Sequence, residues 1–325
     1  MSLPYPPSDH FDGREFHNLD GVPAGRSLAD FLRWQLYGNR PAPWPQQASG
    51  DTVAPALSSH VGPDEMTTTF VGHSTFLFQF TDGLNVLTDP VWSERVSPVT
   101  FAGPRRVRPP AIAFDDLPPV QLVLVSHGHY DHLDVATLRR LDARFNPLFL
   151  TGLGNHAFLR KCGLRQVEEL DWWQSQRYRE LEVTFTPAQH WSNRGTGDRN
   201  TTLWGGFWLR HGRLRVYFAG DSGLGRLFAL VRGRLGTPDL ALLPIGAYEP
   251  RWFMREQHMN PQDAVQAHRA LGSRRSVAMH FGTFRLTEEA IDQPAIDLAA
   301  ALQAAGIDPA EFIVPRFGET IRAKA

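Results

Sequence analysis

A dense group of metal-binding side chains follows a strand-like segment in the first half of the chain. His127, His129, Asp131 and His132 occupy four of six consecutive positions. Residues 120–125, directly before this group, are mostly apolar and rich in valine and leucine, which is typical of a buried strand. Loops that leave a strand end are held by a rigid scaffold and often carry function. One ion with an open position cannot use so many ligands, so the sequence predicts two metal ions; the alternative is a polar loop with a chance cluster of histidines.

Three later residues repeat this pattern of an apolar strand followed by a ligand. They are His190 after 183–189, Asp221 after 214–220 and His280 after 276–279. Taken alone, a single His or Asp after a strand is more often a cap or turn residue. Because strand ends gather at one edge of a sheet, we expect all three to join the first group. Imidazole nitrogens and carboxylate oxygens suit a zinc-class ion, at distances of about 2.0–2.2 Å.

Strand and helix signals come in quick succession from residue 67 onward. The expected strands are 67–71, 75–80, 84–87, 122–125, 147–150, 182–185, 203–209, 214–218, 240–245 and 276–279. The expected helices are 135–141, 261–271 and 294–305. Hairpin-like neighbours mixed with strand–helix units predict two packed sheets with helices outside, in one catalytic domain over 67–325.

The first part of the chain, residues 1–66, differs from the rest. Proline and glycine punctuate it, and only 27–37 has a helical pattern, with Ser27 as the N-cap. We expect this segment to wrap around the core domain and to shape one wall of a cleft. An ordered tail that only covers apolar surface is the alternative. An exposed apolar face on the 27–37 helix would serve membrane contact, a homodimer partner or plain packing.

Composition narrows the class of protein. Hydrophobic residues make up 42% of the 325 positions, which is enough for a sizeable core. A net charge of −1 gives no general attraction to nucleic acid, and no basic stripe with interleaved aromatics is present. The single cysteine, Cys162, excludes an internal disulfide and suits a reducing compartment. No stretch approaches the ~20 apolar residues that span a bilayer, and the N-terminus lacks a secretion signal, so we expect a cytoplasmic protein.

The series of metal-binding residues resembles that of the metallo-β-lactamase superfamily. The resemblance implies an α/β fold, an αββα sandwich of two mixed β-sheets with helices outside and a binuclear metal site at one edge. Matched position by position, the ligands of one ion are His127, His129 and His190, those of the other are Asp131, His132 and His280, and the bridging carboxylate is Asp221. Two Zn²⁺ ions are expected, with Mn²⁺ or Fe²⁺ as alternatives.

Longer blocks resemble one branch of that superfamily, the N-acylphosphatidylethanolamine-hydrolysing phospholipase D family. The similarity runs from about residue 70 to residue 320, and its most specific block is 244–254. Shorter matching blocks are 71–75, 87–90, 170–173, 189–191, 218–223 and 280–284. A phospholipid substrate would imply peripheral contact with the inner face of the membrane.

Two divalent ions that share one water lower its pKa and give a hydroxide nucleophile near neutral pH. We expect Asp131 and Asp221 to be catalytic as well as metal-binding, with Asp221 holding both ions. The leading hypothesis is a zinc-dependent hydrolase, a phospholipase D-type phosphodiesterase that cleaves N-acylphosphatidylethanolamine or a related glycerophospholipid through a metal-bridging hydroxide. A lactone or carbonyl-ester hydrolase of the same superfamily is the alternative, because it uses the same nucleophile.

Further residues are expected to contact the substrate. They are His73, Arg194, Tyr248, Gln257 and His258. A structural histidine is the alternative for His73, and an ordinary surface arginine is the alternative for Arg194. The other three belong to the 244–254 block or follow it, and the resemblance places that segment beside the site.

Imidazole ligands need a hydrogen-bond acceptor on the ring nitrogen that faces away from the metal. Asp89 follows the 84–87 strand, and Asp134 precedes the 135–141 helix. Either carboxylate could orient a histidine ligand, and each is otherwise a turn or cap residue.

Overall fold

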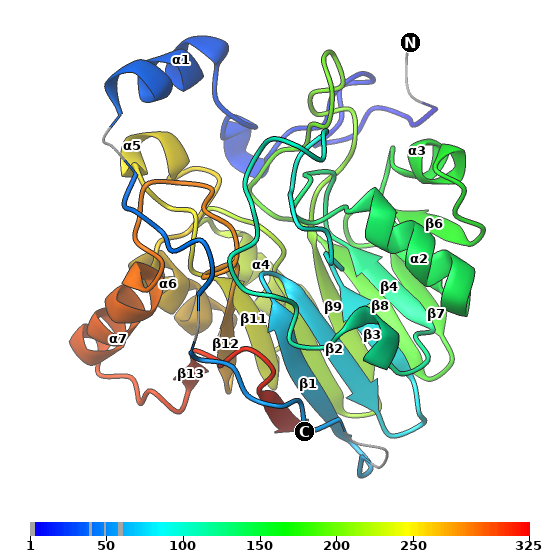
Figure 1. Ribbon diagram of the computed structural model, residues 1–325. Helices are drawn as coiled ribbons and strands as arrows, with labels where there is room; N and C mark the ends of the chain where they lie inside the picture. The colour runs from blue at the N-terminus through cyan, green and yellow to red at the C-terminus, as the bar shows by residue number, and fades with distance from the viewer. Residues whose placement is uncertain (1–3, 39–40, 49, 58–60) are drawn as a thin grey trace.

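Two seven-stranded sheets pack face to face, with helices against their outer faces (Figure 1). The computed structural model describes residues 4–38, 41–48, 50–57 and 61–325. Sequence expectations for residues 1–3, 39–40, 49 and 58–60 lie outside the described part of the chain. The arrangement is the αββα sandwich expected from the sequence, so the predicted fold is confirmed.

Both sheets are mixed, with an antiparallel half and a parallel half. The first has the order β14-β1-β2-β3-β4-β5-β6 and the second β13-β12-β11-β10-β9-β8-β7. The strands of the first sheet are β1 Glu65–Gly72, β2 Thr75–Phe80, β3 Asn85–Thr88, β4 Leu122–Val125, β5 Leu148–Gly152, β6 Val167–Leu170 and β14 Thr320–Lys324. Those of the second are β7 Ser175–Tyr178, β8 Leu181–Thr186, β9 Gly206–His211, β10 Leu214–Phe218, β11 Leu240–Pro244, β12 Ser276–Met279 and β13 Phe312–Ile313.

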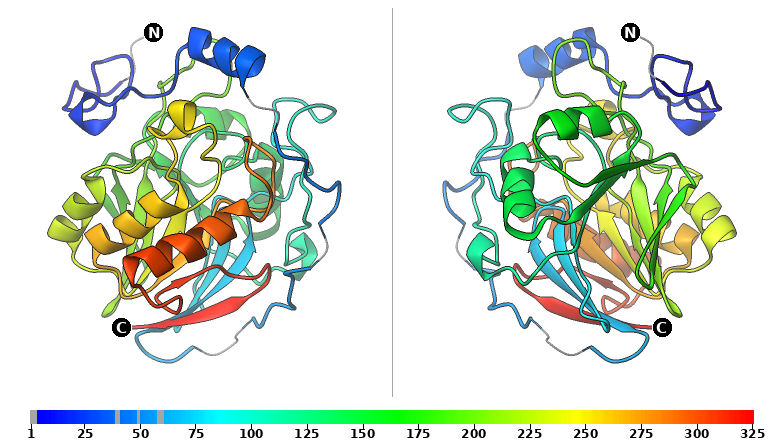
Figure 2. Two further views of the ribbon diagram at one scale, coloured as in Figure 1. Left: turned by 90° about the vertical axis from the view of Figure 1, so that its left-hand side faces the viewer. Right: turned by 90° about the vertical axis from the view of Figure 1, so that its right-hand side faces the viewer.

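The helices cover the sandwich on both sides (Figures 1 and 2). The α-helices are α1 Leu28–Tyr37, α2 Val135–Phe145, α3 His156–Lys161, α4 Leu227–Leu235, α5 Arg251–Met254, α6 Pro261–Leu271 and α7 Gln293–Ala305. Short 3₁₀ helices are η1 Leu19–Gly21 and η2 Phe114–Asp116. Among the described residues, no helix is both long and apolar enough to cross a membrane.

Alternation along the central strands explains the layering. Phe76 and Phe78 of β2 belong to the core between the two sheets, whereas Leu77 belongs to a second core beneath α2. In β4, Leu124 points into the first core and Val123 into the second. Successive side chains of a strand point to opposite faces, so a strand that is apolar throughout must be covered on both faces.

Four strands that the sequence did not predict share one position in the fold. They are β6, β7, β13 and β14, and each lies at an outer edge of its sheet. Edge strands carry more polar side chains; β7, for example, is an alternation of exposed and half-buried residues. The helices α3, α4 and α5 were also not predicted, and the strand expected at 203–209 is β9, which begins at Gly206.

The N-terminal segment crosses one end of the sandwich and then descends along its side (Figure 2). Phe11 and Phe16 are fully buried in the main core, and the Tyr5 hydroxyl donates a hydrogen bond to Glu169 at 2.6 Å. Helix α1 lies over α5, where the rings of Trp34 and Phe253 are 4.9 Å apart. The first sheet begins at Glu65, two residues before the predicted start of the catalytic domain.

Candidate metal centre

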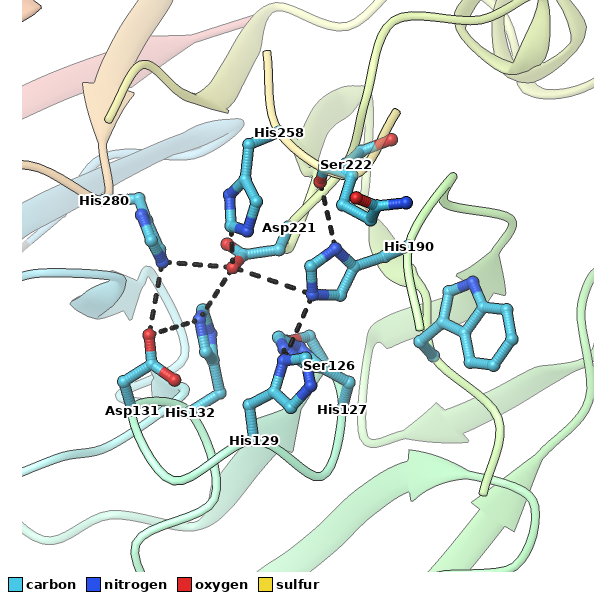
Figure 3. Close-up of polar contacts among 12 residues, drawn as sticks. Ser126, His127, His129, Asp131, His132, His190, Asp221, Ser222, His258 and His280 are labelled. Atoms are coloured by element: carbon cyan, nitrogen blue, oxygen red, sulfur yellow. Dashed lines mark hydrogen bonds and ion pairs between the residues drawn. The ribbon is translucent and has the colours of Figure 1, made fainter. Parts of the chain in front are cut away.

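Four strand ends converge on one edge of the sandwich and carry the predicted ligands. The 126–132 loop leaves β4 of the first sheet, and three single residues follow strands of the second sheet. These are His190 after β8, Asp221 after β10 and His280 after β12. Figure 3 shows the ligand side chains pointing toward one another around a common centre. The structure therefore brings together the residues that the sequence placed in one site.

Three histidines form the first ligand group. His127 Nε2 lies 2.8 Å from His129 Nδ1, and His190 Nε2 lies 3.2 Å from the same atom. All three rings are largely withdrawn from solvent. Three imidazole nitrogens at this spacing are a donor set for a zinc-class ion.

The second group consists of Asp131, His132 and His280, with His73 beside them. Asp131 Oδ2 lies 3.4 Å from His132 Nε2 and 3.3 Å from His280 Nε2. The backbones of His73 and His280 both have left-handed φ values, 58° and 61°, and the His280 N–H donates to the His73 carbonyl at 2.9 Å. Such a conformation costs a non-glycine residue about 1–2 kcal/mol, so the surrounding fold must hold these two histidines in place.

Asp221 lies between the two groups. Its Oδ2 atom is 3.1 Å from His132 Nε2, 3.0 Å from His280 Nε2 and 4.0 Å from His190 Nε2. A carboxylate with two oxygens at this point can hold both groups around one pair of ions. The predicted bridging position is therefore sterically available to Asp221.

A buried hydrogen-bond network fixes the rings of two predicted ligands. Asp89 Oδ2 accepts from His132 Nδ1 at 2.7 Å and from the Ser126 hydroxyl at 2.6 Å. Because that hydroxyl proton goes to Asp89, the Ser126 oxygen accepts from His127 Nδ1 at 2.9 Å. Both imidazoles then present an unprotonated Nε2 to the centre when neutral. Asp89 is thus the orienting carboxylate of the two considered, whereas Asp134 caps α2.

The third ring of the first group is also oriented from outside. His190 Nδ1 donates to the carbonyl oxygen of Gln257 at 2.9 Å. A carbonyl oxygen only accepts, so the proton of neutral His190 is on Nδ1 and the lone pair is on Nε2. Ser126 was not predicted to support the site, although it directly precedes His127 in the sequence.

Atoms at the centre lack partners that an ion would supply. Within the described residues, Asp221 Oδ1 is buried with no hydrogen bond, and His132 Nε2 and His280 Nε2 have none beyond their ion pairs with the Asp131 and Asp221 carboxylates. An unsatisfied buried polar atom costs about 1–3 kcal/mol, and more when it is charged. The nitrogen and carboxylate donors that meet here fit two divalent cations of the zinc class.

The electrostatics of the two groups differ. Burial lowers the pKa of His129 to about 3 and that of His190 to about 4, so both rings are neutral at pH 7. Burial also disfavours the His280 imidazolium, but the carboxylates of Asp221 and Asp131 outweigh it and raise the pKa of His280 to about 9. The second group therefore draws positive charge to itself, which a metal cation would provide.

Three of the predicted substrate contacts lie against the ligands. His73 Nε2 is 3.0 Å from Asp131 Oδ2, and His258 Nδ1 is 3.9 Å from Asp221 Oδ2. Gln257 is buried, and its side-chain Nε2 has no hydrogen-bond partner in the part of the chain that the structure describes. His73 lies beside Asp131 of the second group, and His258 lies beside His190 of the first group and Asp221. The role of both histidines toward a substrate stays a prediction.

The other two predicted contacts use their polar groups elsewhere. Arg194 Nη1 donates to the carbonyls of Gly128 and Leu133, at 2.7 and 2.8 Å, and the guanidinium lies over the Tyr130 ring. Arg194 lines a cavity of about 730 Å³, and none of the predicted metal ligands is among the residues that line this cavity. The buried Tyr248 donates its hydroxyl proton to the α7 residue Asp297 at 2.6 Å. Their substrate roles also stay predictions, and the contacts indicate structural ones.

Comparison with known proteins identifies the superfamily. Residues 84–281 match the family model of the β-lactamase superfamily domain. The chain is 39% identical over 306 residues to an uncharacterised protein of Mycobacterium tuberculosis, covering 91% of this chain and 80% of that protein. It is 40% identical over 228 residues to N-acyl-phosphatidylethanolamine-hydrolyzing phospholipase D 1 of Caenorhabditis elegans, covering 66% of this chain and 64% of that protein.

Solved structures share the fold at low sequence identity. A metallo hydrolase of the archaeon Ignicoccus hospitalis superposes with a TM-score of 0.59 at 24% identity, covering 79% of this chain and 98% of that one. An isothiocyanate hydrolase from gut bacteria of Delia radicum superposes with a TM-score of 0.64 at 22% identity, covering 80% and 100%. The chain belongs to the metallo-β-lactamase superfamily and is a metal-dependent hydrolase of that superfamily.

Proposed function

We propose that this hydrolase is a binuclear zinc enzyme that cleaves N-acylphosphatidylethanolamine or a related glycerophospholipid. The products would be phosphatidic acid and an N-acylethanolamine. The observation that supports the proposal is the convergence of all seven predicted ligands in a chain that is 40% identical over 228 residues to N-acyl-phosphatidylethanolamine-hydrolyzing phospholipase D 1 of Caenorhabditis elegans. Because this chain spans 64% of that relative, the substrate is a proposal and not a transferred property.

The chemistry needs a nucleophile and a stabilised phosphate. When bound, two divalent ions supply a hydroxide at neutral pH and neutralise charge on the phosphate oxygens. Among the chain's own residues, neutral His129 and His190 offer lone pairs without losing a proton. His73 holds the Asp131 carboxylate from outside, at 3.0 Å. Attack by the oxygen of water on phosphorus breaks the bond from phosphorus to the ethanolamide oxygen, which leaves with a proton.

An apolar platform beside the site supports a substrate that resides in a membrane. We define the platform as the exposed apolar side chains of α1 and α5, namely Leu28, Phe31, Leu32, Leu36, Tyr37 and Trp252. Figures 1 and 2 show α1 at the outer end of the molecule, above α5. The guanidinium of Arg33 in α1 lies over the ring of Trp252 in α5, and this cation would attract an anionic headgroup at the platform. Helix α5 leads directly into Gln257 and His258 at the centre.

These positions favour a lipid surface as the occupant of the platform. Burial of apolar area contributes about 25 cal/mol per Å², so several such side chains suffice for reversible binding to a bilayer. The proposal therefore includes a peripheral association with the cytoplasmic face of a membrane. A second copy of the chain seated on the platform is the outcome that would contradict this part of the proposal.

The substrate is tested with the zinc-loaded protein and N-acylphosphatidylethanolamine in mixed micelles, beside a panel of lactones. We expect release of N-acylethanolamine, and in ¹⁸O-water we expect the label in phosphatidic acid. A His129→Ala variant is the matched control and should lose turnover. Turnover of lactones alone would replace the proposal with the carbonyl hydrolase, and full activity in His129→Ala would reject the metal centre.

A further inference from the structure

A side chain of the N-terminal segment is paired with the backbone of a predicted metal ligand. Asn18 Nδ2 donates to the carbonyl oxygen of His190 at 2.9 Å, and Asn18 Oδ1 accepts from the His190 N–H at 3.0 Å. Asn18 is only 4% exposed. Two hydrogen bonds from one planar amide to both backbone groups of a residue fix the orientation of that backbone.

A third bond defines which way the amide points. The indole Nε1–H of Trp204, a fully buried residue, also donates to Asn18 Oδ1, at 3.0 Å. In the opposite orientation the amide NH₂ would face two N–H donors, those of Trp204 and His190. The amide is therefore held in the one orientation that serves the backbone of His190.

The backbone of His190 needs such support from outside its own segment. The described chain has neither helix nor strand between the end of β8 at Thr186 and the start of β9 at Gly206. At the ring, the Gln257 carbonyl sets the direction of Nδ1. At the backbone, Asn18 sets the point from which the ring projects. Together the two contacts aim Nε2 at His129 and Asp221.

The segment that carries Asn18 is anchored by other contacts. Phe11 and Phe16 are fully buried with ring centroids 4.5 Å apart, and the Phe16 N–H donates to the Asn200 carbonyl at 2.8 Å. The buried His10 ring stacks on Trp172 at 4.4 Å. Loss of the Asn18 amide alone would therefore leave the segment in place, and the effect would be local to His190.

We infer that Asn18 is a positioning residue for His190, which makes the N-terminal segment a working part of the metal centre. The inference rests on the proposed function only in taking His190 as a ligand. It chooses between the two interpretations of the N-terminal segment, because a tail that merely covers apolar surface would not affect metal binding.

The test compares metal affinities of variants, measured by zinc competition with a chromophoric chelator. Asn18→Leu keeps the number and branching of the side-chain heavy atoms and removes all four side-chain hydrogen bonds, including a 3.4 Å bond from Nδ2 to the Pro23 carbonyl. Asn18→Asp keeps the two accepted bonds and loses the two donated ones. Phe16→Leu is the matched control, because it destabilises the same segment without touching His190. His190→Ala identifies which of the two ions belongs to the first group.

We expect Asn18→Leu to lower the affinity for one ion, the ion that His190→Ala loses, by about 10–100-fold. This is the range found for residues that orient ligands. The other ion should change little, and Asn18→Asp should show a smaller loss at the same ion. Cobalt-substituted protein should show an altered absorption spectrum for that ion alone. Phe16→Leu should lower the melting temperature and leave both affinities unchanged.

Two results would overturn the inference. One is unchanged metal affinity in both Asn18 variants. The other is that Asn18→Leu and Phe16→Leu lower the affinities for both ions to the same extent. Failure of the proposed function is distinguishable. If the wild-type protein binds two ions but does not cleave the phospholipid, the proposed substrate is wrong, and the affinities still decide the role of Asn18. If it binds no ion at all, both proposals are rejected.

Discussion

The Nδ1–H of His132 donates to the carboxylate of Asp89 across 2.7 Å, and both residues are fully buried. Asp89 also accepts from the backbone N–H and the hydroxyl of Ser126, so one carboxylate steadies both the start of the ligand loop and a ligand. A metal centre of this kind depends on the groups behind the ligands as much as on the ligands themselves.

The first prediction concerns this carboxylate. Asp89→Asn keeps the size of the side chain but removes the charge that orients His132, so metal affinity should fall about 10–100-fold. Chelator competition measures it. The control is Asp134→Asn, which loses hydrogen bonds to Ser93 and Thr137 without touching a ligand. Equal metal affinities in the Asp89 and Asp134 variants would contradict the orienting role.

The second prediction concerns pH. His190 has a pKa lowered to about 4, so an ion at the first group displaces no proton from it at pH 7. His280 has a pKa raised to about 9, so it carries a proton at pH 7 that an ion must displace. Lowering the pH from 8 to 6 should therefore lower the affinity of the second group for its ion by at least about tenfold per pH unit. The affinity of the first group for its ion should fall far less.

Calorimetric titration in buffers of different ionisation enthalpy measures the protons released. One of the two ions should release at least one proton per chain and the other close to none. Equal proton release for both ions would show that the carboxylates do not hold a proton on His280 in the metal-free protein.

The third prediction separates two roles of Arg194. Arg194→Met removes the donor to the carbonyls of Gly128 and Leu133, so the free energy of unfolding should fall by about 1–3 kcal/mol. The ratio of KM values for anionic and neutral substrates should not change. Arg139→Met, on the exposed side of α2, is the control. A selective rise in KM for anionic substrates, at unchanged stability, would instead establish Arg194 as a substrate contact.

The fourth prediction concerns the apolar platform. Leu32→Asp with Leu36→Asp should weaken sedimentation with vesicles of phosphatidylcholine and phosphatidylglycerol by more than about tenfold, since each buried leucine contributes roughly 1.5–3 kcal/mol. Hydrolysis of a soluble short-chain substrate should be unaffected. Ile296→Asp, at an exposed apolar residue of α7, is the matched control. A change from dimer to monomer in size-exclusion chromatography, with unchanged vesicle binding, would identify a second copy as the occupant.

The interior of the fold was predictable because central strands are apolar on both faces. β4 is four buried apolar residues in a row, and the ligand loop begins at once behind it. β7 and β14 were not predictable in this way, because each lies at a sheet edge and alternates with solvent-facing polar side chains. Tertiary position, and not local pattern, makes these segments strands.

The convergence of the predicted ligands was predictable for the same reason, since each follows a recognisable strand. Asn18 was not, because 172 residues separate it from His190. Asn18 also binds backbone atoms of residue 190, which every residue type except proline offers, so the sequence at position 190 does not indicate the contact. For Arg194 and Tyr248 the sequence indicated polar groups near the site, but the direction of each side chain depends on the partners Gly128 and Asp297.

The proposed centre holds two ions between residues on separate strand ends. Its most direct test is the metal content of the chelator-stripped protein after titration with zinc and removal of free ion, measured by plasma mass spectrometry. We expect two ions per chain in the wild type, and loss of tight binding of both in Asp221→Ala, because Asp221 lies between the two groups. Fewer than two ions in the wild type, or two tightly held ions in Asp221→Ala, would contradict it.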